Sequence, residues 1–263
     1  MRIGLIGIVD QQLRDDFAGT LARVAAIGYQ GMEFGLATLE QAPLPLAEIA
    51  GRLAGVGLQT ANLHVMTPVL MDRFAEVVAT AHRLGCPYVT IPWGPAESAE
   101  QLQRDAATYN ELGARYRAEG LGLCYHNHDH ELRTFAGRHG LEILLAESEP
   151  ANLRSQLDVC WVRFGGVDPV AFLRQYADRI PLVHMKDVAR LEPGCETGHG
   201  SHEQMVFTEV GTGIVDIVAV GAAAREAGVE WATVEQDRMR ALSPWESITC
   251  SYLNLKAREL VQA

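Results

Sequence analysis

Ionisable side chains gather at the ends of the apolar, β-rich segments of this sequence. Segment 121–128 ends in two histidines, 153–158 ends in an aspartate, 180–186 carries a histidine and a lysine, and 230–235 ends in a glutamate. A charged group at the end of a buried strand is costly unless it is paired, metal-bound or used in chemistry. We therefore expect a functional site there. The residues concerned are His126, His128, Asp158, His184, Lys186 and Glu235.

A metal centre is the chemistry that this set favours. One imidazole, from His126 or His128, would meet a second imidazole and two carboxylates if the four segments lie side by side. The other three ligands would be Asp158, His184 and Glu235. Nitrogen and oxygen ligands suit Mn²⁺, Mg²⁺, Co²⁺, Zn²⁺ or Fe²⁺, whereas the lack of a thiolate argues against a structural zinc site. We expect one divalent ion, with Mn²⁺ as the first choice.

Other polar and aromatic residues are candidates for contact with a substrate. Lys186 shares the strand face of His184, because residues two apart in a strand point the same way, and a cation beside a metal suits a polarised carbonyl or alkoxide. Four more residues lie at the ends of apolar segments or just after them, although each could instead be a core residue, an ion-pair partner or a packing residue. We expect substrate contacts from Glu33, His64, Trp93 and Trp161.

The segments that carry these residues alternate with helical patterns, eight times in 263 residues. Such alternation predicts parallel strands, and eight units of this size match a closed (β/α)₈ TIM barrel, in which active sites lie at the C-terminal ends of the strands. A doubly wound sheet is the alternative, but the Gly-x-Gly-x-x-Gly turn of its dinucleotide-binding form is missing after the first strand. We expect a single domain over residues 1–263. The expected strands are 3–8, 31–34, 58–65, 88–91, 121–128, 153–158, 180–186 and 230–235. The expected helices are 13–27, 46–56, 69–84, 98–119, 141–147, 170–178, 214–227 and 244–260.

Composition narrows the classes of partner. The formal net charge is −11, which disfavours nucleic acid and anionic membranes as partners. No apolar run reaches the ~18 residues of a membrane span, and the five cysteines form no Cys-x-x-Cys pair, so we expect a cytoplasmic protein. Segment 188–209 is expected to be a long loop over the site or at a subunit contact, with His199 and His202 on its surface. A homo-oligomer is left open.

The ordered motifs resemble a known family. Tyr125-His126-Asn127-His128-Asp129, Val183-His184-Met185-Lys186-Asp187, Val210-Gly211-Thr212-Gly213-Ile214-Val215-Asp216 and Val234-Glu235-Gln236-Asp237 follow one another at strand ends, with Leu157-Asp158 between the first two. Together they resemble the xylose isomerase-like barrels grouped as sugar phosphate isomerases/epimerases. The His-x-Lys-Asp and Gly-x-Gly-x-x-Asp segments are most similar to those of inosose dehydratase and its relatives.

The resemblance implies particular roles. Metal ligands would be Asp158, His184 and Glu235, with His126 in the place of a glutamate that is usual in the family. Arg190 matches a substrate-binding arginine of the epimerases, and Lys186 matches the inosose dehydratase type. Trp161 stands where relatives commonly carry a histidine. Abasic-site endonucleases of the same barrel need that histidine and a basic groove, so that alternative is disfavoured.

The activity implied is proton abstraction next to the carbonyl of a ketose or keto-sugar. The metal would stabilise the enediolate, Glu235 would be the base, and His126 or His128 would handle the proton on the opposite side, with His128 our choice. If the enediolate is reprotonated, the protein is an isomerase or epimerase, and this is the activity that we favour. Loss of a β-hydroxyl would instead make it a lyase acting on a keto-inositol or 3-keto-sugar. A non-catalytic sugar-binding barrel is the alternative from another class.

Overall fold

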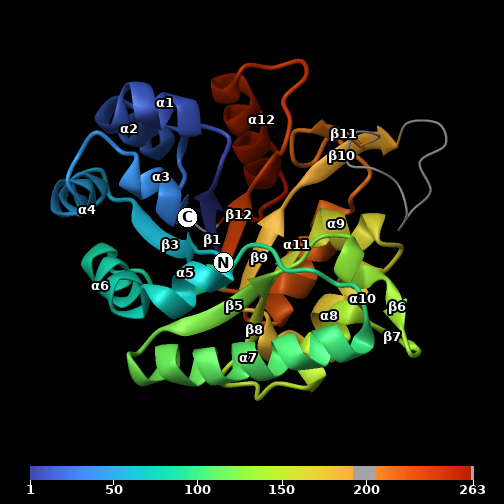
Figure 1. Ribbon diagram of the computed structural model, residues 1–263. Coiled ribbons are helices and arrows are strands. Elements are labelled where there is room, and N and C mark those ends of the chain that lie inside the picture. The colour runs from blue at the N-terminus through green and yellow to red at the C-terminus, as the bar shows by residue number, and fades with distance from the viewer. Residues whose placement is uncertain (192–204, 262–263) are drawn as a thin grey trace.

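Eight parallel strands close into a barrel in the computed structural model, which describes residues 1–191 and 205–261 (Figure 1). Around the barrel the order is β1-β2-β3-β4-β5-β8-β9-β12, and β12 pairs with β1 to close it. The (β/α)₈ prediction is therefore confirmed. The barrel strands are β1 (Arg2–Leu5), β2 (Gly31–Gly35), β3 (Gln59–His64), β4 (Tyr88–Ile91), β5 (Gly122–His126), β8 (Arg154–Asp158), β9 (Leu182–Met185) and β12 (Trp231–Val234).

Helices surround the closed sheet, as Figure 1 shows, and bury their apolar faces against it. The larger helices are α2 (Phe17–Ile27), α4 (Leu46–Gly55), α6 (Phe74–Leu84), α7 (Ala99–Ala118), α8 (Gly140–Ala146), α10 (Pro169–Gln175), α11 (Ile217–Glu226) and α12 (Pro244–Ala257). Shorter ones are α1 (Asp10–Asp15), α3 (Leu36–Glu40), α5 (Thr67–Asp72), α9 (Val159–Phe164) and the 3₁₀ turns η1 (His130–Leu132) and η2 (Ala177–Arg179).

Two of the expected helices are each divided in two. The side chain of Asp16 accepts a hydrogen bond from the backbone N–H of Gly19, so α2 begins with its own cap after α1 ends. Arg73 separates α5 from α6, although its side chain does not cap the second helix. Apolar periodicity runs through both breaks, which is why the sequence pattern alone predicted continuous helices.

We had expected a long loop after β9, but part of this stretch forms strands. Strands β10 (Asp187–Leu191) and β11 (Met205–Thr208) pair antiparallel and extend beyond the barrel end in Figure 1. A second small hairpin joins β6 (Thr134–Phe135) to β7 (Arg138–His139). His199 and His202, which we had expected on the surface, lie outside the described residues.

Asp187 fixes the chain where it leaves β9. Its buried carboxylate accepts hydrogen bonds from four backbone N–H groups, those of Val188, Gly211, Gly213 and Val215, at 2.9–3.1 Å. Gly213 is required there, because a Cβ atom would lie 2.2 Å from the carbonyl oxygen of Val188 and 2.3 Å from Asp187 Oδ1. The His-x-Lys-Asp and Gly-x-Gly-x-x-Asp segments are thus joined through one carboxylate, whose role here is structural.

No helix among the described residues is long and apolar enough to cross a membrane. The barrel strands and the helices around them share one large cluster of buried apolar residues. The expectation that residues 1–263 form one domain stays a prediction.

Candidate active site

Four polar side chains from consecutive strands of the barrel meet at its C-terminal end. His126 and Asp158 are the last residues of β5 and β8, His184 lies on β9, and Glu235 directly follows β12. Their potential ligand atoms all lie within 4.8 Å of one another. This is the set that the sequence led us to expect, and the strand-five member that joins it is His126 rather than His128.

Two buried atoms of this set have no hydrogen-bond partner in the described part of the chain: His126 Nδ1 and Asp158 Oδ2. The other oxygen of Asp158 accepts a bond from the backbone N–H of Trp161 at 2.9 Å. Lys186 Nζ lies 3.1 Å from Asp158 Oδ2, a contact that is an ion pair without hydrogen-bond geometry. Leaving a buried polar atom unsatisfied is costly, and a cation bound between these donors would satisfy both. The residues present therefore fit a divalent ion.

The protonation states of His126 and Asp158 follow from burial. Burial, together with the nearby imidazoles of His184 and His128, holds the pKa of His126 well below its usual range. His126 is thus neutral, the form that binds metals. Burial raises the pKa of Asp158 to about 6, against the opposing effect of the Lys186 ammonium.

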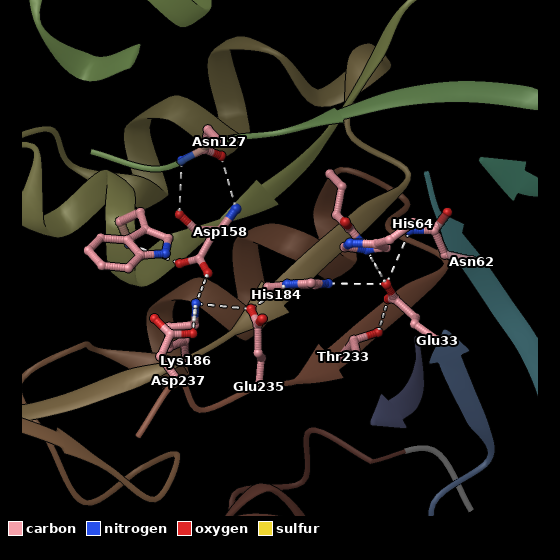
Figure 2. A network of polar contacts seen from close by, with 12 residues as sticks. Glu33, Asn62, His64, Asn127, Asp158, His184, Lys186, Thr233, Glu235 and Asp237 are labelled. Atoms are coloured by element: carbon pink, nitrogen blue, oxygen red, sulfur yellow. Dashed lines mark hydrogen bonds and ion pairs between the residues drawn. The ribbon is translucent and has the colours of Figure 1, made fainter. Parts of the chain in front are cut away.

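His184 lies between two carboxylates, as Figure 2 shows. Its Nδ1 is 2.8 Å from Glu235 Oε2, and its Nε2 is 3.2 Å from Glu33 Oε2. Burial acts to lower the pKa of His184, but Glu33 and Glu235 outweigh it and raise the pKa to about 10. A metal-binding histidine usually gives its second ring N–H to a carboxylate, and Glu33 is placed to accept it.

Glu33 is wholly enclosed by protein groups. Its side chain has 0% exposure. It accepts bonds from Asn62 Nδ2 at 3.1 Å and Gln156 Nε2 at 2.8 Å, contacts the hydroxyl of Thr233, and lies 3.0 Å from His64 Nε2. Burial favours the neutral acid, but His184 and His64 outweigh it and hold the pKa of Glu33 well below its usual range. We had expected a substrate contact, whereas all these contacts are with protein side chains.

Lys186 is buried among carboxylates, with 1% of its side chain exposed. Its Nζ lies 3.0 Å from Glu235 Oε2 and 2.8 Å from Asp237 Oδ1, in addition to Asp158 (Figure 2). Burial acts to lower the pKa of Lys186, but these three carboxylates raise it well above its usual range. The ammonium also faces the ring of Trp161, 5.1 Å from its centroid. Lys186 is therefore charged and held in place.

Aromatic residues form one side of the site. The partly buried His128 lies 5.6 Å from the Trp161 ring and 5.8 Å from His130, and His130 lies 5.8 Å from Trp93, all between centroids. Trp93 is 46% exposed and Trp161 only 1%. The expected substrate contact of Trp93 therefore stays a prediction, while the buried Trp161 packs against Lys186 and His128.

His64 and Arg190 were also expected to contact a substrate. The side chain of His64 is 11% exposed and borders a cavity of 260 Å³ whose lining includes Leu36, Met66 and Pro92. His64 also stacks on His184, with ring centroids 5.5 Å apart and planes within 8°. Arg190 lies exposed on β10. Its predicted contact with substrate stays a prediction.

Sequence reasoning missed the residues that contact the side chains of Glu33 and Lys186. Asn62, Gln156 and Thr233 surround Glu33, and Asp237 contacts Lys186. The period of two in a strand could have revealed them. Asn62 precedes His64 by two residues, Gln156 precedes Asp158, Thr233 precedes Glu235, and Asp237 follows Glu235 by two.

Comparison with known proteins assigns the family. The family model for the xylose isomerase-like TIM barrel matches residues 21–250, so the chain belongs to that family. A curated relative, an inosose dehydratase from Lacticaseibacillus casei, is 28% identical over 163 residues, which cover 58% of this chain and 53% of that relative. The chain therefore matches only about half the length of this relative.

Solved structures share the fold. A sugar phosphate isomerase/epimerase from Parabacteroides distasonis ATCC 8503 superposes with a TM-score of 0.81 at 21% identity, covering 99% of each chain. A structure of the IolI protein with a bound zinc atom has a TM-score of 0.77 at 17% identity, covering 98% of each chain. At these identities the likeness describes the barrel and not the reaction.

Proposed function

We propose that the protein is a divalent-metal-dependent enzyme that moves a proton next to the carbonyl of a ketose or keto-sugar. The observation that carries this proposal is the convergence of His126, Asp158, His184 and Glu235, with ligand atoms within 4.8 Å of one another, beside the buried ammonium of Lys186. A non-catalytic sugar-binding barrel would have no use for a buried cluster of this kind, which is costly to desolvate.

The four converging residues would hold the metal. When bound, a divalent ion supplies Lewis-acid stabilisation of negative charge that develops on a carbonyl oxygen. Mn²⁺ is our first choice, with Mg²⁺, Co²⁺, Zn²⁺ and Fe²⁺ as alternatives, because imidazole and carboxylate ligands suit them all. The IolI structure, which contains zinc, supports a metal in a barrel of this family.

Glu235 is the proposed base. Burial acts against its ionisation, but Lys186 and His184 outweigh this and hold the pKa of Glu235 well below its usual range. Its side chain is 21% exposed, in contrast to the enclosed Asp158 and His184, so it can reach a substrate. Glu235 takes the α-proton, the electron pair of the C–H bond passes to the carbonyl, and an enediolate results. His128 exchanges a proton on the opposite side.

The fate of the enediolate determines the reaction class. Return of a proton to the neighbouring carbon or to the other face gives isomerisation or epimerisation, our first proposal. A second candidate is β-elimination, in which the C–O bond to a β-hydroxyl breaks and the oxygen leaves as water. The similarity to an inosose dehydratase favours this candidate. Lys186 can stabilise the negative charge in either case.

Product mass separates the two reactions. The metal-loaded protein is incubated with a panel of ketoses, 3-keto-sugars and keto-inositols, and the products are analysed by mass spectrometry. Isomerisation gives a product of unchanged mass, whereas dehydration gives one lighter by a water. If the purified protein takes up none of the five metals and converts none of these substrates, the proposed function is wrong.

A further inference from the structure

Lys186 contacts two of the carboxylates that the proposed metal centre needs. Its Nζ lies 3.1 Å from Asp158 Oδ2 and 3.0 Å from Glu235 Oε2. The same Glu235 oxygen also faces His184 Nδ1 at 2.8 Å. An ammonium in this position occupies the oxygens through which a divalent cation would bind.

The third carboxylate around Lys186 does not belong to the proposed metal set. Asp237 Oδ1 makes the shortest of the three contacts, at 2.8 Å from Nζ, and its side chain is 32% exposed. Asp237 follows Glu235 by two residues, in the segment after β12. In Figure 2 Lys186 lies between Asp158 and Glu235 on one side and Asp237 on the other.

We propose that Lys186 competes with the divalent ion for Asp158 and Glu235, and that Asp237 is the positioning residue that holds the ammonium when the ion binds. This inference rests on the metal site of the proposed function. With Asp237 present, the ammonium keeps a charged partner after it leaves the other two carboxylates.

Charge and burial support this exchange. Three carboxylates, those of Asp158, Glu235 and Asp237, surround the single ammonium of Lys186, so carboxylates outnumber the ammonium and a divalent ion can share them. Lys186 is 1% exposed and faces the Trp161 ring, so its ammonium is almost wholly shielded from bulk water. A buried charge that loses its partner is strongly destabilising, so metal binding requires that Lys186 keep one.

Lys186 and Asp237 should therefore act in opposite directions on metal affinity. Lys186→Met removes the competing charge, so we expect Mn²⁺ to bind about tenfold more tightly than to the wild type. Asp237→Asn leaves the ammonium on Asp158 and Glu235 alone, so we expect binding about tenfold weaker. In a Lys186→Met background, Asp237→Asn should have a much smaller effect, because Asp237 acts through Lys186.

Calorimetric titration of the full chain with Mn²⁺ alone tests this without any assay of turnover. Lys256→Met and Glu226→Gln, at exposed positions of the surface helices α12 and α11, are the controls for loss of a positive and of a negative charge. Asp237 is partly exposed, so Asp237→Asn should fold even if Lys186→Met does not, and thermal unfolding checks both.

Three results would overturn the inference. The first is unchanged or weaker binding by a folded Lys186→Met variant, and the second is unchanged or tighter binding by Asp237→Asn. The third is an equal effect of Asp237→Asn in both backgrounds. If the wild type binds Mn²⁺ in these cases, the proposed metal site survives and only the role of Lys186 and Asp237 fails. Failure of every variant and of the wild type to bind would contradict both.

Discussion

Glu33 and His184 face each other in the barrel interior, with Glu33 Oε2 3.2 Å from His184 Nε2 and both side chains at 0% exposure. The opposite ring nitrogen of His184 points to Glu235. With a metal at the proposed site, Glu33 would accept the Nε2–H of His184 and leave Nδ1 as the atom that can bind the ion. A glutamate that looked like a substrate contact is placed to orient a ligand.

Glu33→Gln should weaken metal binding by about 10- to 100-fold, the usual effect of losing such an outer partner. The amide keeps the size of the side chain but removes the charge that holds the His184 ring. Titration with Mn²⁺ measures the affinity. Glu230→Gln, just before the last barrel strand, is the control, because Glu230 pairs with Tyr88 and Arg2 instead. Wild-type affinity in a folded Glu33→Gln protein would contradict this role.

Asp158 caps α9 and is also a proposed metal ligand, and substitution can separate these two roles. Asp158→Asn and Asp158→Ala should both lose bound metal, because each removes a charged ligand oxygen. Only the alanine variant also loses the cap of α9, where Asp158 Oδ1 accepts the N–H of Trp161, so it should be less stable than the asparagine variant by about 1 kcal/mol. Metal analysis and urea unfolding measure the two effects. Metal retained by both variants would remove Asp158 from the ligand set.

The sequence predicted the barrel well because its signals are local. Most strands end near a polar residue and most helices end at a glycine or a cap, so the eight β–α units were recognisable from periodicity. Breaks such as Asp16 were missed, because a cap inside an apolar pattern does not interrupt the pattern. The β10–β11 hairpin was missed because its two strands are far apart in the chain and lie in a stretch that has no clear alternation.

The site was predicted in part for a similar reason. His126, Asp158, His184 and Glu235 lie at or near strand ends. In a TIM barrel the C-terminal ends of all strands lie at one end of the barrel, so these residues could be predicted to lie close together. The role of Glu33 depends on side chains from β3, β8, β9 and β12 that surround it, a relationship between distant strands. Burial of Trp161 likewise depends on Lys186, His128 and Phe207 packing on it.

Gly213→Ala should destabilise the protein by several kcal/mol, because its Cβ would lie 2.2 Å from the carbonyl oxygen of Val188 and would disturb the Asp187 hydrogen bonds. Gly51→Ala is the matched control. Gly51 lies inside α4, and apart from its own helix backbone and chain neighbours no described atom lies within 4 Å of the position that its Cβ would take, so alanine there should stabilise by about 0.5–1 kcal/mol. Urea unfolding measures whether Gly213→Ala lowers and Gly51→Ala raises the free energy of unfolding. Equal stability would contradict the close packing around Asp187.

Lys186→Met should lower turnover while metal stays bound. The charge that stabilises the enediolate or the departing hydroxyl is lost, and one such group is worth about 2.7–4 kcal/mol of transition-state stabilisation, or about 10²–10³ in kcat. Steady-state kinetics on the substrate found in the product-mass experiment measure it, with bound Mn²⁺ determined in parallel. Unchanged kcat in a folded variant would remove Lys186 from the catalytic groups.

Solvent deuterium exchange tests the central claim most directly. In D₂O, the metal-loaded wild type should place deuterium on the carbon next to the carbonyl of its substrate or product, because Glu235 or His128 delivers a solvent-derived proton there. Glu235→Gln should abolish the exchange, since the amide cannot take the proton. Turnover by the wild type with no deuterium at that carbon would indicate direct hydride transfer, and would contradict the proposed proton abstraction.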